Sequence, residues 1–271
     1  MTRRSFLAIA ASAKWVNQGS AQDILTLPPP KADARIAYGK AAQQFGDLRL
    51  PKGPGPHPAV IFIHGGFWRN VYSLDHVGHL CAALAHAGAA TWSIEYRRLG
   101  DPGANWAAMA DDIVRGAEHL VPLANRYNLD LKRVVAAGHS SGGQLALWLA
   151  AQQVIDLRGV VPLAAVSDLR RAYALQLDGG VVGELLGGSP DRVPQRYAAA
   201  SPMELLPIPV PQRVLHGTAD HVVPFDMSQR FAKASKNAKL IPLPGAGHFE
   251  LIDPRAKEWP TIQKNILDWE F

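Results

Sequence analysis

Residues 134–149 read VVAAGHSSGGQLALWL, and this stretch decides how the rest of the sequence is interpreted. Its first four residues are apolar, as in a buried strand, and its last six form an apolar helical run. Between them lies a G-x-S-x-G motif from Gly138 to Gly142. A sharp turn from strand to helix leaves no room for a Cβ atom at either glycine, and it holds the middle residue in a strained conformation. The sequence therefore predicts that Ser140 is an exposed nucleophile at this turn.

The motif contains two adjacent serines, and only the first has the spacing of a nucleophile. Ser140 has a glycine two residues before it and another two residues after it, whereas His139 lies two residues before Ser141. Ser141 comes instead at the predicted start of the helix, where its backbone N–H can donate to an oxyanion. His139 is a candidate residue of the substrate pocket.

A second glycine pair, in the segment HGGFW at residues 64–68, directly follows the apolar run AVIFI. That run predicts a strand buried on both faces. Glycine lets backbone N–H groups point into a site without obstruction, so we predict that Gly66 and Phe67 donate to the same oxyanion; an ordinary turn is the alternative. We interpret His64 as structural. For Trp68, a place in the substrate pocket and packing in the core are equally good interpretations.

A serine hydroxyl needs a base, and the base needs a partner that holds its tautomer. His248 lies in the loop after the predicted strand 239–243, and Asp220 lies in the loop after the predicted strand 213–215. Functional groups of a parallel sheet collect at the carboxyl ends of its strands, and the chain order serine, aspartate, histidine is that of nucleophile-elbow hydrolases. We therefore predict His248 as the base and Asp220 as its partner. The competing residues, interpreted as surface or helix-capping groups, are Asp168, His221, Asp226, Glu250 and Asp253.

Strand and helix patterns alternate along most of the chain. The predicted strands are residues 35–38, 45–50, 59–63, 89–94, 134–137, 159–164, 213–215 and 239–243, and the predicted helices are 74–87, 106–127, 144–153, 226–235 and 259–269. Such alternation predicts an α/β fold, a mostly parallel sheet with helices on both faces. No linker divides the chain, so residues 22–271 are predicted to form one domain. Residues 169–203 are rich in glycine and proline and interrupt the alternation of strands and helices. They are predicted to form a lid-like insertion.

The composition excludes several classes of protein. With 48% hydrophobic and 19% charged residues over 271 positions, the chain has enough apolar surface to build a core. Its single cysteine, Cys81, can form neither an intramolecular disulfide nor a thiolate metal cluster. His76 and His79 have a spacing seen in metal sites but no third ligand motif nearby, so we interpret them as a solvated helix face and predict no metal. No basic run interleaved with aromatic residues predicts nucleic-acid binding, and no apolar stretch predicts a membrane span.

The N-terminus has the pattern of an export signal. Arg3 and Arg4 form a twin-arginine pair before an alanine-rich apolar stretch, and Gly19-Ser20-Ala21 has the small residues of a signal-peptidase site. These 21 residues hold three basic and no acidic residues, so the net charge of the chain falls from +5 to +2 without them. We predict that residues 1–21 direct the protein to the periplasm or the exterior. A short N-terminal extension on a cytoplasmic protein is the alternative.

The segments IHGGFW, EYRR, GHSSGG, HGTADHVVP and GAGHFELID, taken in this order, resemble the α/β-hydrolase superfamily, and within it the branch of arylformamidase-like enzymes and acetyl or feruloyl esterases. The resemblance runs from about residue 35 to the C-terminus. It implies an eight-stranded, mostly parallel sheet, the catalytic residues Ser140, Asp220 and His248, and no cofactor. Phe67 stands where lipolytic members have the third glycine of HGGG, so we expect no long-chain lipase activity.

The expected function is hydrolysis of small-molecule carboxylic esters with short or medium acyl groups, through an acyl-enzyme on Ser140. An arylformamidase would use the same residues on N-formyl aromatic amines, and the HGG-aromatic-Trp segment resembles that group more closely. Two further interpretations stay open, a small exopeptidase and a non-catalytic binding protein of the same fold. The sequence does not predict an oligomeric state.

Overall fold

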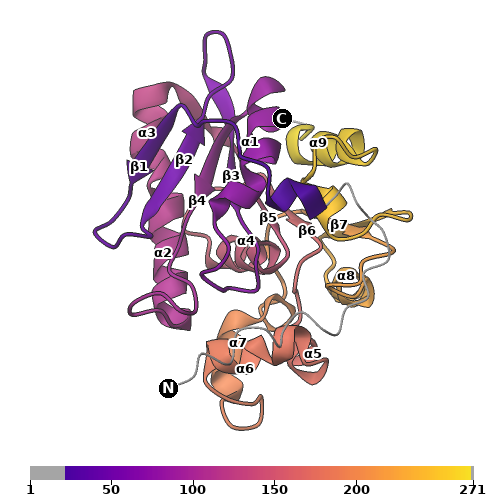
Figure 1. Ribbon diagram of the computed structural model, residues 1–271. Helices are drawn as coiled ribbons and strands as arrows, with labels where there is room; N and C mark the ends of the chain where they lie inside the picture. Colours follow the sequence, from indigo (N-terminus) through magenta and orange to yellow (C-terminus); the bar gives the residue numbers. More distant parts are fainter. Residues whose placement is uncertain (1–21, 270–271) are drawn as a thin grey trace, which may run out of the picture.

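The computed structural model describes residues 22–269, and the predicted export signal, residues 1–21, lies outside the described residues. The strands are β1 (Ala34–Ala37), β2 (Phe45–Arg49), β3 (His57–Ile63), β4 (Ala90–Ile94), β5 (Leu129–His139), β6 (Gly159–Leu163), β7 (Gln212–Gly217) and β8 (Ala238–Leu243). They form one eight-stranded sheet in the order β1-β2-β4-β3-β5-β6-β7-β8 (Figure 1). β2 runs opposite to the other seven strands, which are all parallel to one another. The predicted mostly parallel, eight-stranded sheet is confirmed.

The central strands are apolar on both faces because each face is covered by helices. Along β3, Ile61 and Ile63 face one hydrophobic cluster, while Val60 and Phe62 face another. Successive side chains of a strand point to opposite faces, so an uninterrupted apolar run is what a sheet between two helical layers requires. The strand that precedes the G-x-S-x-G motif, β5, follows the same rule.

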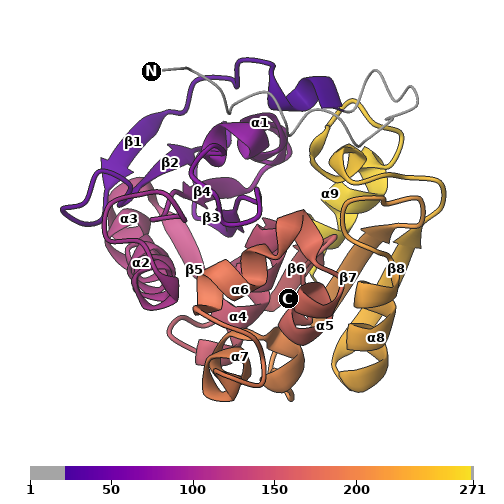
Figure 2. The same ribbon diagram turned by 60° about the horizontal axis from the view of Figure 1, so that its bottom comes forward.

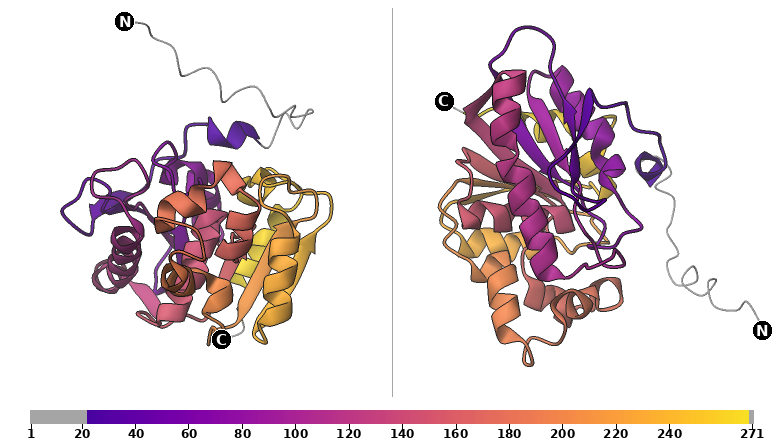
Figure 3. Two further views of the ribbon diagram at one scale, coloured as in Figure 1. Left: turned by 90° about the horizontal axis from the view of Figure 1, so that it is seen from below. Right: turned by 90° about the vertical axis from the view of Figure 1, so that its left-hand side faces the viewer.

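Two layers of helices cover the sheet. On one face lie η1 (Gln22–Leu25), η2 (Leu74–Val77), α1 (Gly78–His86), η5 (Phe249–Ile252) and α9 (Trp259–Leu267). On the other lie α2 (Trp106–Glu118), α3 (Leu120–Tyr127), α4 (Ser141–Gln152) and α8 (Asp226–Ala234), as Figure 3 shows from two sides. The sequence predicted one helix over residues 106–127, but the helix is broken at His119. Pro122 has no N–H to continue the hydrogen-bond ladder, and it is tolerated because it falls in the first turn of α3.

The segment predicted as an insertion is a group of short helices between β6 and β7. It contains α5 (Leu169–Ala174), η3 (Leu177–Gly179), α6 (Val181–Leu186), α7 (Pro194–Ala200) and η4 (Pro202–Glu204). These helices gather at one end of the molecule (Figures 1 and 2). Arg69, in the loop after β3, forms ion pairs with Asp178 at 2.5 Å and with Glu184 at 3.1 Å, so the insertion is tied to the loop that carries the second glycine pair. Within residues 22–269, no helix is long and apolar enough to cross a membrane.

Candidate active site

Ser140 occupies a sharp turn between β5 and α4. Its backbone has φ 58° and ψ −122°, a conformation that costs a non-glycine residue about 1–3 kcal/mol and that the surrounding structure must stabilise. A Cβ atom on Gly138 would lie 2.2 Å from the carbonyl oxygen of Gly142, and a Cβ atom on Gly142 would lie 2.2 Å from the carbonyl oxygen of Ile63. Both flanking positions therefore require glycine, as the sequence predicted.

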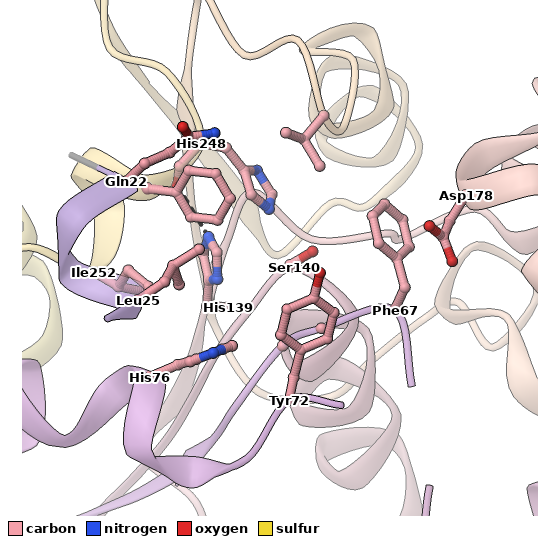
Figure 4. Close-up of a pocket in the computed structure, with 14 residues that line it drawn as sticks. Gln22, Leu25, Phe67, Tyr72, His76, His139, Ser140, Asp178, His248 and Ile252 are labelled. Carbon is pink, nitrogen blue, oxygen red and sulfur yellow. Dashed lines mark hydrogen bonds between the residues drawn. The ribbon is translucent and has the colours of Figure 1, made fainter. Parts of the chain in front are cut away.

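A cavity of about 280 Å³ opens at Ser140, at the carboxyl ends of the central strands (Figure 4). Its lining residues are Gln22, Leu25, Gly65, Gly66, Phe67, Tyr72, His76, His139, Ser140, Asp178, Val222, His248, Phe249 and Ile252. Five predicted site residues, Gly66, Phe67, His139, Ser140 and His248, are among them. His139 packs its ring against His248 at a centroid distance of 4.4 Å, and its pKa is held well below the ordinary value because the ring is buried and faces His248.

Trp68 does not line this cavity, so its interpretation as a pocket residue is wrong. Its indole is 1% exposed and belongs to the hydrophobic core, where its Nε1–H donates to Gln144 Oε1 at 3.0 Å. Phe67 and Trp68 both have left-handed backbones, with φ 51° and 58°. Phe67 lines the cavity while Trp68 is buried. A left-handed backbone conformation is rare for aromatic residues. The residue types of Phe67 and Trp68 therefore do not predict which of the two side chains faces the cavity.

His248 and Asp220 form a buried hydrogen-bonded pair. His248 Nδ1 donates to Asp220 Oδ2 at 2.6 Å, and the backbone N–H groups of Val222 and Val223 donate to Asp220 Oδ1 at 2.8 and 2.9 Å. Burial alone would raise the pKa of Asp220, but hydrogen bonds from His216 and His248 outweigh it and hold the pKa well below the ordinary value. Asp220 is therefore a carboxylate that fixes the proton of His248 on Nδ1. Figure 4 shows the His248 ring and the Ser140 hydroxyl pointing toward each other.

A second imidazole contacts Asp220, and sequence reasoning missed it. His216 Nε2 lies 3.2 Å from Asp220 Oδ2 and 2.9 Å from the carbonyl oxygen of Val223. Both neighbours are acceptors, so Nε2 carries a proton and donates it, while Nδ1 accepts from the hydroxyl of Ser228 at 2.7 Å. His216 is thus a second donor that holds the carboxylate in place. The signal was present in the sequence, since His216 opens the segment HGTAD that ends at Asp220.

The competing acidic residues and His221 do not line the cavity. Asp168 is the N-cap of α5 and accepts from the backbone N–H of Arg171 at 3.0 Å, the capping role predicted for it. Asp226 pairs with Arg171 at 2.9 Å, and Asp253 pairs with Arg255 at 2.7 Å. His221 is exposed and does not line the cavity, and neither does Glu250.

Three backbone N–H groups are available to an oxyanion beside Ser140. Among the described residues, the N–H groups of Gly66, Phe67 and Ser141 have no backbone acceptor. Gly66 has φ 113°, and a Cβ atom there would lie 2.5 Å from the Cβ of Tyr72. The loop that carries Gly66 and Phe67 approaches the nucleophile closely, because a Cβ atom on Gly65 would lie 3.0 Å from the Cβ of Ser140. Free backbone donors beside the nucleophile are one requirement of oxyanion stabilisation.

Glu95, directly after β4, is a buried acceptor beneath this loop, and sequence reasoning missed it. Its Oε1 lies 2.9 Å from His64 Nε2 and 3.0 Å from Arg98 Nη1, and its Oε2 accepts from the backbone N–H of Leu74 at 3.2 Å. His64 Nδ1 lies 2.8 Å from the carbonyl oxygen of Gly65, which supports the structural interpretation of His64. Burial would raise the pKa of Glu95, but His64 and Arg98 outweigh it and lower that pKa. Glu95 therefore positions the oxyanion loop as a carboxylate.

We expect Glu95→Gln to lower the free energy of unfolding by about 1–3 kcal/mol at pH 7, because the amide is neutral and cannot accept from all of these donors. Folding lowers the pKa of Glu95, so its contribution to stability is present above the ordinary glutamate pKa of 4.5 and is lost as the pH falls further. Urea unfolding of the unmodified chain and of Glu95→Gln, at pH 7 and at pH 4, measures this difference in the free energy of unfolding. A stability difference that is the same at both pH values would contradict the role of the charge.

His76 lines the cavity, so the interpretation of His76 as part of a solvated helix face is wrong. It is half-buried, and burial, followed by the nearby His64, lowers its pKa to about 4. It is therefore neutral at physiological pH and presents a polar but uncharged ring to the cavity (Figure 4). Residues 22–269 contain no group of three or more His, Cys, Asp or Glu side chains arranged to hold a metal ion.

Comparison with known proteins gives one family and several relatives. A family model described as BD-FAE matches residues 47–234. The chain is 26% identical over 263 residues to Esterase LipC of Mycobacterium tuberculosis, covering 86% of this chain and 63% of LipC. It is 29% identical over 131 residues to a kynurenine formamidase of Meyerozyma guilliermondii, covering 46% of this chain and 44% of that protein. The chain thus spans less than two thirds of the length of either relative.

Among solved structures, an esterase B described as from Lactobacillus rhamnosis superimposes with a TM-score of 0.76 at 19% identity, covering 92% of this chain and 90% of that one. This similarity shows that the chain has the α/β-hydrolase fold.

Proposed function

The chain belongs to the BD-FAE family, and on that premise we propose that it hydrolyses carboxylic esters with short or medium acyl groups through an acyl-enzyme on Ser140. The observation that carries the proposal is the site itself. A serine on a strained turn and a histidine held by a buried carboxylate line one cavity of about 280 Å³. LipC, which is named an esterase, supports the same reaction class.

The proposed mechanism has two steps. His248 Nε2 takes the proton of Ser140 as Oγ attacks the substrate carbonyl, because Nδ1 is already protonated and bound to Asp220. The N–H groups of Gly66, Phe67 and Ser141 stabilise the oxyanion of the tetrahedral intermediate. The imidazolium then protonates the leaving alcohol, and water, deprotonated by the same histidine, attacks the acyl-enzyme to release the acid. Asp220 stays ionised throughout and stabilises the imidazolium.

The size of the cavity supports short and medium acyl groups. A volume of about 280 Å³ lies at the lower end of the usual range for small-molecule sites, roughly 300–1,000 Å³. Phe67 lines the cavity and stands at the position where lipolytic members of the superfamily carry glycine. We therefore propose a small ester as substrate and no activity on long-chain lipids.

Formamide hydrolysis is the second candidate. The similarity to a kynurenine formamidase, together with the HGG-aromatic-Trp segment at residues 64–68, favours it. The same nucleophile and oxyanion donors would act on an N-formyl aromatic amine, and the two candidates differ only in substrate.

We expect kcat/KM for p-nitrophenyl acetate and butyrate to exceed that for p-nitrophenyl octanoate and for N-formyl-kynurenine by about tenfold or more. Rates measured on the purified chain with all four substrates test this. A higher kcat/KM for the formamide would replace the esterase proposal by the second candidate. Failure of a fluorophosphonate to label Ser140 would instead indicate a binding protein without hydrolase activity.

A further inference from the structure

The segment of residues 22–30, which we call the N-terminal strap, is fixed against the rest of the molecule beside the cavity. Ile24 is 1% exposed and packs in the same core cluster as α1 and α9. Pro29 lies directly on α1, since a Cβ atom on Gly78 would be 2.4 Å from the Pro29 Cβ. The carbonyl oxygen of Pro30 accepts from Arg49 Nη2 at 3.0 Å. The strap is thus anchored at both of its ends.

Two strap residues, Gln22 and Leu25, line the cavity. They belong to η1, which contacts both η2 and η5, and Figure 2 shows the indigo η1 beside the yellow C-terminal segment. Leu25 belongs to the same hydrophobic cluster as Phe249 and Ile252 of η5. The first and last parts of the chain therefore build one wall together.

The two sides of the cavity differ in chemistry. Figure 4 shows Gln22, Leu25 and Ile252 on the opposite side of Ser140 from Phe67 and Asp178. The side of the strap carries the apolar side chains of Leu25 and Ile252 beside the uncharged Gln22, whereas the side of the insertion carries the carboxylate of Asp178, held by Arg69. An apolar substituent of an ester is stabilised on the side of the strap, and its length is limited by the side chain that closes that side.

This wall lies outside the residues that the family model matches. The family model matches residues 47–234, whereas the wall comes from residues 22–25 and 249–252. The nucleophile and the oxyanion loop lie inside that region. The wall is thus built by segments on either side of the matched residues, and His248, the proposed base, lies in the same C-terminal region.

We propose that Leu25 is a specificity-determining residue, which closes the apolar side of the cavity and limits the length of the apolar group, acyl or alkyl, that the ester carries. The proposal rests on the proposed esterase function and names the feature that sets its substrate range. Gln22 adds a polar edge to the same wall. The strap therefore takes part in substrate selection in addition to packing on the fold.

The test compares Leu25→Ala and Leu25→Phe with the unmodified full chain. The substrates are p-nitrophenyl esters from acetate to octanoate, and acetates of alcohols from methanol to octanol. In each series we compare kcat/KM for the eight-carbon substrate with kcat/KM for the shortest one, which has two carbons in the acyl series and one in the alcohol series. We expect Leu25→Ala to raise this ratio by about tenfold in one of the two series, and Leu25→Phe to lower the ratio in that series. The two variants change the cavity in opposite directions, so general loss of stability does not mimic the pattern.

Leu27→Ala is the matched control. Leu27 is in the same strap, is partly buried and packs on the same core cluster, but it does not line the cavity. For Leu27→Ala, the ratio of kcat/KM for the longest over the shortest substrate is expected to stay within about twofold of that of the unmodified chain. Ratios for Leu25→Ala that are unchanged in both series, or equal to those of Leu27→Ala, would overturn the proposal while leaving the esterase function intact. An unmodified chain that hydrolyses none of these esters would overturn both.

Discussion

Replacing Ser140 by alanine is expected to lower kcat/KM for p-nitrophenyl acetate by about 10⁵- to 10⁶-fold. The variant has no nucleophile for the covalent step, and the residual rate comes from the oxyanion donors and from binding alone. Because Ser140 has a strained backbone with φ 58°, which alanine tolerates no better, we expect the substitution to leave stability close to that of the unmodified chain. Initial rates and thermal unfolding, measured on the same preparation, separate the two effects.

The control for this variant is Ser189→Ala, which makes the same chemical change in the insertion, outside the residues that line the cavity. It is expected to keep the activity of the unmodified chain. If Ser140→Ala hydrolyses the ester as fast as Ser189→Ala, another residue is the nucleophile and the mechanism is wrong.

The parts of the fold that could be predicted from the sequence are those encoded by local patterns. Apolar runs such as residues 59–63 predict central strands because both faces of the sheet are covered. Ser140 could be predicted because the close approach of β5 and α4 admits only glycine at positions 138 and 142, which leaves a readable motif. The positions of His248 and Asp220 followed from their place after strands of a parallel sheet.

The rest depends on contacts between distant segments. Glu95 becomes the acceptor beneath the oxyanion loop only once β3 and β4 pair side by side. The strap helix η1 has four residues, too few for a periodic pattern, and it is stabilised by Ile24 packing against the C-terminal part of the chain. Trp68 is buried in the core and donates to Gln144, whereas Phe67 has a similar left-handed backbone and lines the cavity. Substrate-contacting residues are therefore the least predictable part of this site.

The second large effect is expected for Asp220→Asn, which should lower kcat by about 10⁴-fold at pH 7 while leaving KM less affected. The carboxylate accepts from His248 Nδ1 at 2.6 Å and from His216 Nε2 at 3.2 Å. An asparagine amide group placed toward His248 would donate instead, so the proton of His248 would move to Nε2. The ring would then present a donor to Ser140, where the reaction needs an acceptor.

The control is Asp253→Asn, because Asp253 is also a buried aspartate whose pKa is lowered despite its burial, here by Arg255. It lies outside the cavity lining and is expected to keep activity within a few-fold of the unmodified chain. Equal losses in the two variants would show that the effect of Asp220→Asn reflects a lost buried charge rather than the tautomer of His248.

The pH dependence of Asp220→Asn separates catalysis from stability. The pKa of Asp220 is held well below the ordinary aspartate value of 3.8, so its charge stabilises the fold above that value and this contribution is lost only as the pH falls further. Asp220 is thus ionised at every pH where His248 can act as a base. We therefore expect the deficit of about 10⁴-fold to persist from about pH 5 to pH 8. A deficit that is absent at about pH 5 and appears only on raising the pH to about 7 would mean that Asp220 is protonated at the lower pH, and that its hydrogen bonds do not outweigh its burial.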